Sequence, residues 1–497
     1  MDCVTFHVNG RETTLRDVSP TTTLLQYLRG PMRLPGTKEG CAEGDCGACT
    51  VVVLDGQAPG GPRWRAVNSC LLLVPLLHGK QIFTVEGLRD KPGDEGLHPV
   101  QRALVDALGS QCGYCTPGVV MSMVEACHRP DLDADWKLDD QMCGNLCRCT
   151  GYRPILEATR NVAGLSPSDR LSAARDETPK TQPALDYGTD SARGAQRFWI
   201  PTSWEALFGI ISAHPGGPEK VRFIQGATDL GLDVTKHGTH FEALISLQGI
   251  EELRTLEVVG TRWSVGAGVK LADLEDATDD TLPPLSRMLR FFGSRQIKNS
   301  ATVGGNVCNA SPIGDLAPVF LALNATFIAR GVTGERPIAA DDFFTGYRTT
   351  ALQRGELLAR IEFDAPTTSS RFASYKVSKR REMDISAVAA ALRVEVDEDD
   401  IITDARFVYG GMAATPARAH SAEAAAIGSP FVEATFEACA AAMTSDFTPM
   451  SDHRGSAWYR STVAANLMRG FYLEVCGTPM PRLSDRPSGT VLGGSPS

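Results

Sequence analysis

The distribution of cysteine constrains this chain more than any other feature of its sequence. Eleven of the 14 cysteines lie in the first 149 residues, and only three lie in the remaining 348. In a reducing compartment, clustered thiols bind metal more often than they form disulfides. The densest stretch reads GCAEGDCGACT at residues 40–50. The front third of the chain must therefore bring several thiolates together, and we expect it to do a different job from the rest.

The first cysteine group spans residues 41–70. Its spacing, C-x4-C-x2-C followed by a later cysteine, is that of plant-type 2Fe–2S sites. A cluster is larger than a single ion, so the loop around it must curl tightly, and glycines permit the positive φ that this needs. Those glycines are Gly40, Gly44 and Gly47. Structural zinc, which usually shows two CxxC knuckles, and a disulfide network are the alternatives.

The second group pairs CGYC at residues 112–115 with CRC at residues 147–149. Each pair lies beside the expected start of a helix, where free N–H groups and the helix dipole favour thiolates. The pairs alone also suit zinc, but beside a ferredoxin-like site they fit a second cluster better. We expect Cys127 to be a packed helix thiol and Cys143 a bystander. The predicted metal ligands of both groups are Cys41, Cys46, Cys49, Cys70, Cys112, Cys115, Cys147 and Cys149.

Turn residues and periodicity divide the chain into an α+β multidomain protein. Alternating Val4–Val8 and Glu12–Leu15 around Asn9-Gly10 predict a β-hairpin at the start. Later parts show helical periodicity, polar stretches and mixed strands and helices. The expected division is a small α+β domain at 1–86, a helical domain at 87–165, a linker at 166–196, α+β parts at 197–372 and 373–480, and a disordered tail at 481–497.

Charge and hydropathy exclude several classes of function. The formal net charge is −10, which does not favour binding to nucleic acid or to an anionic membrane surface. The first residues lack the basic and apolar regions of a signal peptide. The longest apolar run, Leu71–Leu77, is far shorter than the roughly 20 residues of a membrane span. We therefore expect a cytoplasmic protein.

The cysteine motifs resemble the iron–sulfur half of the molybdenum hydroxylases, the family that includes xanthine dehydrogenase and aldehyde oxidase. The resemblance rests on GCAEGDCGAC, QCGYCTPG and GNLCRCTGYRP. It implies two 2Fe–2S clusters, the first in a ferredoxin-like β-grasp domain and the second in a four-helix domain. Gln111 matches a family glutamine near the molybdopterin cofactor; a helix-capping or core amide is the alternative.

Glycine-rich turns in the second half suggest a phosphate-bearing ligand. FIQGATDLG at residues 223–231 enters a glycine turn, and Gly304-Gly305 allows backbone N–H groups to approach a pyrophosphate. There is no GxGxxG between a strand and a helix, so a Rossmann site is not expected. On this pattern alone, ordinary turns remain the alternative.

The same segments resemble the two-part FAD-binding domain of the molybdenum hydroxylases, which ends in a C-terminal α+β subdomain. Phe292 would lie at the isoalloxazine side. Ala227 replaces the glycine or asparagine that is commoner in the family, so its contact would be through the backbone. The FAD contacts that the resemblance implies are Phe223, Ile224, Gln225, Gly226, Ala227, Thr228, Asp229, Leu230, Phe292, Thr302, Gly305, Asn306, Asp315, Leu358 and Lys376.

Two clusters and a flavin make a chain of electron carriers, because each cluster moves one electron and a flavin accepts one or two. We find no catalytic residues for hydroxylating an organic substrate in this chain, so that centre is expected on a partner. We expect the first cysteine group nearer the flavin and the second nearer the partner.

The domain order resembles the small subunit of bacterial xanthine dehydrogenase. This implies a molybdopterin-binding large subunit, a heterotetramer of two small and two large chains, hydroxylation of hypoxanthine or xanthine to urate, and NAD+ as acceptor. The alternatives are the equivalent subunit of an aldehyde or N-heterocycle hydroxylase, a zinc-stabilised scaffold without catalysis, and a stand-alone NADH:acceptor reductase.

Overall fold

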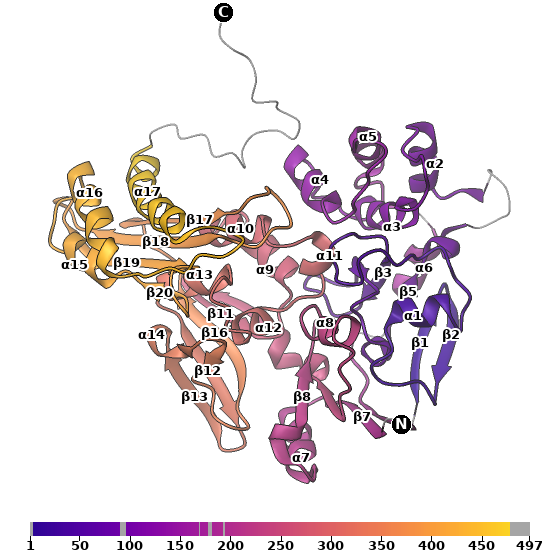
Figure 1. Ribbon diagram of the computed structural model, residues 1–497. Coiled ribbons are helices and arrows are strands. Elements are labelled where there is room, and N and C mark those ends of the chain that lie inside the picture. The colour runs from indigo at the N-terminus through magenta and orange to yellow at the C-terminus, as the bar shows by residue number, and fades with distance from the viewer. Residues whose placement is uncertain (1–2, 90–95, 168, 177–180, 192–193, 478–497) are drawn as a thin grey trace, which may run out of the picture. The chain divides into compact units, whose positions relative to one another are not determined.

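The computed structural model describes residues 3–89, 96–167, 169–176, 181–191 and 194–477 (Figure 1). The predicted disordered tail, 481–497, lies outside these residues. The described residues form two compact units, the first holding those up to Glu251 together with Gly293–Ala301 and the second holding Glu252–Phe292 together with 302–477. Within the described ranges, no helix combines the length and the apolar character that crossing a membrane requires.

The first unit begins with the predicted hairpin. Asn9 and Gly10 both have positive φ, 54° and 78°, as a tight two-residue turn between twisted strands requires. The sheet has the strand order β2-β1-β5-β3-β4, and β1 pairs with β5 in parallel. This confirms the ferredoxin-like fold expected from the cysteine motif. The elements are β1 (Val4–Val8), β2 (Arg11–Leu15), α1 (Leu24–Arg29), β3 (Thr50–Asp55), β4 (Arg63–Asn68) and β5 (Gln81–Phe83).

Strand β3 is buried on both faces. Val51 and Val53 pack with α1 and with the sheet formed by strands β6–β9. Val52 and Leu54 point the other way and pack with the helices that follow. Because side chains of a strand alternate between faces, the continuous apolar run TVVVL serves two cores at once. This strand therefore holds the first cysteine group, which directly precedes it, between two packed layers.

Four helices follow, as the resemblance implied, and α3 is the central one (Figure 1). Every residue of α3 from Gly118 to Cys127 is buried, so the helix is enclosed by its neighbours rather than amphipathic. Cys127 is fully buried, which confirms its prediction as a packed thiol. The helices are α2 (Pro99–Asp106), α3 (Thr116–Cys127), α4 (Asp135–Met142) and α5 (Arg153–Val162).

The segment predicted as a linker, 166–196, differs from that expectation. It contains helix α6 (Arg170–Asp176), strand β6 (Leu185–Ser191) and the start of β7 (Gly194–Ile200). Tyr187 is 1% exposed, and its hydroxyl donates to the carbonyl of Val18 at 2.5 Å and accepts from the N–H of Val18 at 3.0 Å. Val18, the partner of Tyr187, lies 169 residues earlier in the chain, so the polar composition of the segment did not predict its structure.

The first unit also holds the four-stranded sheet β6-β7-β9-β8, in which β7, β9 and β8 run parallel. Its inward residues share one hydrophobic core with the ferredoxin-like sheet. The remaining elements are α7 (Trp204–Ala213), β8 (Val221–Ile224), α8 (Leu230–Thr235) and β9 (Ala243–Ser246).

The second unit has two main antiparallel sheets. The first has the order β10-β11-β16-β12-β13, and the second β17-β18-β19-β20. The strands of the first are β10 (Leu256–Val259), β11 (Arg262–Gly266), β12 (Thr326–Gly331), β13 (Gly334–Ala339) and β16 (Leu357–Asp364). The helices of this part are α9 (Leu271–Thr278), α10 (Pro283–Arg290), α12 (Val303–Cys308), α13 (Leu316–Ala322) and α14 (Ala340–Phe343), with a short pair β14 (Phe344–Gly346) and β15 (Thr349–Thr350).

The second sheet of this unit carries three helices of the C-terminal part, shown in yellow and orange in Figure 1. Its core is rich in alanine and phenylalanine, and small residues let these helices pack closely onto the strands. The elements are β17 (Ser370–Val377), β18 (Val388–Val396), β19 (Ile402–Gly410), β20 (Ala417–Arg418), α15 (His420–Ala426), α16 (Glu433–Ala442) and α17 (Ala457–Val475).

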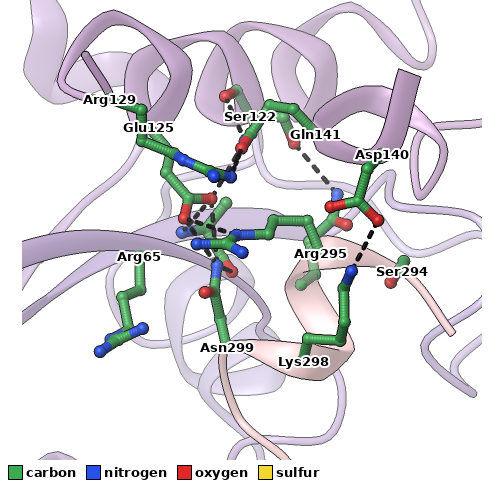
Figure 2. A network of polar contacts seen from close by, with 12 residues as sticks. Arg65, Ser122, Glu125, Arg129, Asp140, Gln141, Ser294, Arg295, Lys298 and Asn299 are labelled. Carbon is green, nitrogen blue, oxygen red and sulfur yellow. Dashed lines mark hydrogen bonds and ion pairs between the residues drawn. The ribbon is translucent and has the colours of Figure 1, made fainter. Parts of the chain in front are cut away.

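The segment Gly293–Ala301, which includes α11 (Arg295–Lys298), belongs to the core of the first unit (Figure 2). Lys298 is fully buried, and its amine lies 2.6 Å from the carboxylate of Asp140. Arg295 Nε lies 3.4 Å from Glu125 Oε1. Asn299 donates to both oxygens of Glu125, at 2.9 and 3.0 Å. Buried charges are tolerated only when paired and hydrogen-bonded, so these contacts make the segment structurally integral.

We predict that Lys298→Met lowers the free energy of unfolding of the first unit by about 3–5 kcal/mol, because Asp140 then lacks its closest cation while buried. The double variant Lys298→Met/Asp140→Leu should recover most of this loss, since an apolar pair of similar volume replaces both charges. Chemical denaturation followed by circular dichroism measures both. A single variant as stable as the unmodified chain would contradict the prediction.

Candidate functional site

The structure brings the four thiols of the first cysteine group together. Cys41 and Cys46 exchange contacts, since the N–H of each lies 3.3 Å from the sulfur of the other. The Cys46 thiol lowers the pKa of Cys41 to about 5. Likewise, the Cys70 thiol lowers the pKa of Cys49. The Cys49 thiol in turn raises the pKa of Cys70. Cys41 also acts electrostatically on both Cys49 and Cys70, so the two pairs form one group.

Backbone geometry of the loop partly matches the expectation from its glycines. Gly44 and Gly47 have positive φ, 86° and 69°. Gly40 does not, and here the prediction was wrong. A Cβ at Gly40 would lie 2.7 Å from the sulfur of Cys46, so glycine is required there by space and not by backbone conformation.

N–H groups of the loop point at the thiols. The N–H of Glu43 lies 3.4 Å from Cys41 Sγ, and the amide of Asn68 lies 3.8 Å from Cys49 Sγ. Such donors stabilise negative sulfur and would tune the potential of a bound cluster. The donor set of four thiols with several N–H groups therefore fits a 2Fe–2S cluster.

The second group forms the pairs Cys112 with Cys149 and Cys115 with Cys147, through contacts between their thiols. Cys115 is the N-cap of α3, as expected for a pair beside a helix start. Burial, together with Cys147, raises the pKa of Cys115 to about 12. The hydroxyl of Thr150 lies 3.1 Å from Cys147 Sγ. The structure thus joins the two halves of this group, which are more than thirty residues apart in the chain.

The two groups differ in exposure. Cys49 and Cys70 are each 2% exposed, whereas Cys112 and Cys149 are exposed. Within the described residues, no three His, Cys, Asp or Glu side chains converge on the position of a single metal ion. Assignment of the ligands therefore rests on the pairwise thiol contacts and on the donors around them. Gln111 is exposed, which argues against the alternative of a core amide.

The predicted flavin residues of the first unit lie on one loop. Phe223 and Ile224 end strand β8, and Leu230 begins α8. A Cβ at Gly226 would lie 2.2 Å from the carbonyl of Ser300, so glycine is required for the loop to pack on the segment Gly293–Ala301. Ala227 has φ 60°, a conformation that glycine or asparagine adopts with less strain. This explains why those two residues are commoner at such a turn.

The predicted flavin residues of the second unit centre on Asp315. Its carboxylate lies 2.7 Å from the amine of Lys376 and accepts from the hydroxyl of Ser386 at 2.5 Å. Lys376 also donates to the carbonyl of Phe291 at 2.8 Å. The structure therefore joins two predicted residues from separate elements, Asp315 directly before α13 and Lys376 on β17. Leu358 is 4% exposed on β16, and Phe292 is partly buried.

The adjacent glycines of this unit have different roles. A Cβ at Gly304 would lie 2.6 Å from that of Ala267, so this residue permits close packing inside the unit. Gly305 is exposed, and its N–H is held by the hydroxyl of Thr302. The side-chain oxygen of Asn306 is buried and has no hydrogen-bond partner in the described part of the chain. An open glycine beside an unpaired amide oxygen fits a polar ligand.

A cavity of about 380 Å³ adjoins the predicted flavin residues of this unit, since Lys376 and Phe291 line it together with several other cations. Several already have partners, such as Arg287 with Glu474 and Lys379 with the carbonyl of His453. The cationic lining fits an anionic ligand. The cations are Arg287, Arg290, Lys376, Lys379, Arg380 and Arg381.

The sequence did not indicate that Gln296, Asn145 and the charged residues around them form a buried polar network. Arg295 and Lys298 are 3% and 0% exposed, although such residues usually lie at the surface. A run such as SRQIKN shows no periodicity, and only the acids supplied by distant helices explain its burial. Two basic residues in a short segment that precedes a predicted cofactor loop are the one available signal.

Four protein-family models match successive parts of the chain. They are the 2Fe-2S iron-sulfur cluster binding domain (residues 6–74), the [2Fe-2S] binding domain (84–160), the FAD binding domain in molybdopterin dehydrogenase (193–366) and the CO dehydrogenase flavoprotein C-terminal domain (373–475). The chain therefore carries two iron–sulfur domains and an FAD-binding domain.

Curated relatives match nearly the whole chain. The xanthine dehydrogenase of Emericella nidulans is 32% identical over 99% of this chain and 40% of its own length. That of Oryza sativa is 33% identical over 84% of this chain and 35% of its own length. Aldehyde oxidase 2 of Cavia porcellus is 31% identical over 95% and 40%. The chain spans about two fifths of the length of these relatives.

Solved structures match the flavin part. A carbon monoxide dehydrogenase from Hydrogenophaga pseudoflava is 25% identical with a TM-score of 0.50, covering 55% of this chain and 94% of that chain. Quinoline 2-oxidoreductase from Pseudomonas putida 86 has a TM-score of 0.51 over 56% of this chain and 96% of that one. At 23% identity, the second likeness shows the fold alone.

We predict that Gly47→Ala destroys the first cysteine loop. A Cβ there would lie 2.2 Å from the carbonyl of Gly144, in addition to about 1–2 kcal/mol of left-handed strain. The matched control is Gly260→Ala, which has φ 62° but nothing within 4 Å. Iron analysis should show loss of metal only in the Gly47 variant. Equal iron content in both variants would contradict the prediction.

Proposed function

The chain belongs to the molybdenum hydroxylase family, and from this premise we propose that it is the electron-transfer chain of a xanthine dehydrogenase. It would carry electrons from a molybdopterin centre on a partner chain, where hypoxanthine or xanthine is hydroxylated to urate, to NAD+. Bound 2Fe–2S clusters supply one-electron transfer and FAD supplies the exchange between one and two electrons. The observation that carries the proposal is the connected order of the two cysteine groups and the flavin loop within the first unit.

The first cysteine group is tied to the helix that follows the flavin loop. Thr235 donates to the carbonyl of Ala42 at 2.8 Å, and Lys236 pairs with Glu43 at 3.1 Å. A Cβ at Gly231 would lie 2.9 Å from the carbonyl of Leu71, which directly follows Cys70. Helix α8 therefore positions this loop against the loops of the first group. These contacts support the expectation that the first cluster is the one nearer the flavin.

Cys112 and Cys149 of the second cysteine group are exposed, and the group is flanked in sequence by exposed apolar side chains. Leu108 is 80% exposed and Tyr114 51% exposed. Exposed apolar residues of this size mark surfaces that contact another protein. We assign this surface to the chain that carries the molybdopterin. The exposed residues are Val105, Leu108, Tyr114, Leu146 and Tyr152.

The chain spans about 40% of the relatives named xanthine dehydrogenase, and the matching family models are those of iron–sulfur and flavin domains. We propose a large molybdopterin-binding subunit and a heterotetramer of two small and two large chains. The cationic cavity of the second unit supports NAD+ as acceptor, because the phosphates of NAD+ are anionic.

For FAD, we propose the full set of contacts expected from the sequence. Asp315 and Lys376 would act as one unit, since the amine of Lys376 orients the carboxylate at 2.7 Å. Gly305 and the unpaired Asn306 oxygen would face the polar part of the ligand, while Phe292 would contact its ring. In the first unit, the loop between β8 and α8 would contribute through its backbone.

An aldehyde or N-heterocycle hydroxylase subunit is the second candidate. The identity to aldehyde oxidase 2 of Cavia porcellus, 31%, is close to that of the xanthine dehydrogenases. Isolation with the partner chain and a screen of purines, aldehydes and N-heterocycles separates the two. Turnover of aldehydes but not of purines would replace the primary proposal.

We predict that the purified chain contains about four iron atoms and one FAD, from two 2Fe–2S clusters and one flavin.

Cys147→Ser should remove the second cluster signal in electron paramagnetic resonance (EPR) and leave FAD bound, because the flavin residues lie on other elements. The chain should pass electrons from NADH to a dye without oxidising xanthine. Zinc in place of iron, or xanthine oxidation by this chain alone, would contradict the proposal.

We also predict that Lys376→Met releases FAD and leaves iron unchanged, because Lys376 holds Asp315 in the second unit while all the predicted iron ligands lie in the first. Arg336→Met is the matched control, since it breaks a 2.6 Å ion pair with Glu356 in the same unit outside the predicted flavin set. Flavin absorbance and iron analysis measure the outcome. Retention of FAD by the Lys376 variant, or equal loss by both, would argue against this contact.

A further inference from the structure

The two cysteine groups meet directly in the first unit. The N–H of Leu146, which precedes Cys147 of the second group, donates to the carbonyl of Cys46 of the first group at 3.0 Å. A route from one thiol to the other therefore runs through covalent bonds and one hydrogen bond. Electronic coupling decays less steeply along such a route than across empty space.

Glycines make this meeting possible. A Cβ at Gly47 would lie 2.2 Å from the carbonyl of Gly144, and one at Gly118 would lie 2.1 Å from the carbonyl of Gly47. Backbone at these distances cannot give way to a side chain. Three backbones, those of the first cysteine loop, helix α3 and the second cysteine loop, are thus in contact at one point, which we call the junction of Gly47, Gly118 and Gly144.

Asn145 ties the junction together. It is 3% exposed, and its amide donates to the carbonyl of Gly47 at 3.2 Å. Its side-chain oxygen accepts from the hydroxyl of Ser122 at 2.6 Å. Asn145 is adjacent to Leu146 in the chain, so the orientation of its side chain is coupled to that of the N–H that bonds Cys46.

Gln296, on the segment Gly293–Ala301, bonds Asn145 from the other side. It is fully buried, and its amide donates to Asn145 at 2.9 Å and lies 3.0 Å from the hydroxyl of Ser122. A Cβ at Gly144 would lie 2.1 Å from the Gln296 carbonyl oxygen, so the side chain also packs on the second cysteine loop. A buried amide with several partners holds one geometry firmly.

We propose that Gln296 is a positioning residue for electron transfer between the two cysteine groups, acting through Asn145 on the hydrogen bond between Leu146 and Cys46. This inference rests on the proposed function. The step moves one electron from the centre held by the second group to the centre held by the first, and no proton or covalent bond changes. The flavin-domain segment that carries Gln296 thereby contributes to a step in which the flavin takes no part.

The test compares Gln296→Leu with Asn299→Leu in the full chain. Leucine has the branching and the number of side-chain heavy atoms of asparagine and one heavy atom fewer than glutamine, and it removes the hydrogen bonds of either amide. Asn299 is the matched control because it lies in the same buried segment but bonds Glu125 and the carbonyl of Ala66, not the cysteine loops. Iron and FAD content, the EPR signal of each cluster, the magnetic interaction between them, and the rate of electron redistribution after rapid partial reduction are measured.

We expect both variants to retain iron, FAD and both cluster signals, with a lower stability in Asn299→Leu because two hydrogen bonds to the buried Glu125 are removed. In Gln296→Leu, the magnetic interaction should weaken and redistribution should slow several-fold, while in Asn299→Leu both should match the unmodified chain. An unchanged redistribution rate in Gln296→Leu, or equal slowing in both variants, overturns the inference and leaves the proposed function standing. An unmodified chain without iron overturns the proposed function itself.

If Gln296→Leu does not accumulate iron, Gln296→Glu takes its place. Glutamate keeps the length of the side chain and, when ionised, has no N–H to donate to Asn145 or Ser122. Slower redistribution with both cluster signals present supports the inference, and an unchanged rate overturns it.

Discussion

The buried ion pairs of the segment Gly293–Ala301 are the contacts on which the first unit depends. Lys298 with Asp140 and Arg295 with Glu125 place charges where water does not reach, and such charges are tolerated only with partners in place. Their acids come from helices α3 and α4, whereas the bases come from the middle of the chain. Folding of the helical iron–sulfur domain is therefore coupled to one short segment from the middle of the chain.

This coupling has a consequence for electron transfer. The same segment packs Ile297 beside Cys49 and Cys70, contacts the flavin loop at Gly226, and bonds the junction of Gly47, Gly118 and Gly144 through Gln296. One short segment thus contacts the first cysteine group, the predicted flavin loop and the second cysteine loop within the first unit. Distances that control electron transfer are better held by such an element than by separate domains on flexible linkers.

Sequence reasoning succeeded where local chemistry decides the outcome. The hairpin at Asn9-Gly10 follows from the turn geometry, and the helix starts beside the second cysteine group follow from Pro117 and Pro154 at the first turns. It failed where the decisive partner is distant. Tyr187 in the supposed linker is held by Val18, and the buried Lys298 is paired with Asp140, which lies 158 residues earlier in the chain.

The sequence by itself determined the chemistry, because the spacing and type of the cysteines restrict which metal centres can form. It also determined the order of the domains along the chain. Only the tertiary structure decided which thiols pair, that Cys112 and Cys149 are exposed, and that Gln296 bonds Asn145 beside the second group and Thr50 beside the first. The physical reason is that burial and contact depend on residues more than a hundred positions apart in the chain. The sequence alone does not distinguish the buried Lys298 from an exposed lysine, because its burial depends on pairing with Asp140.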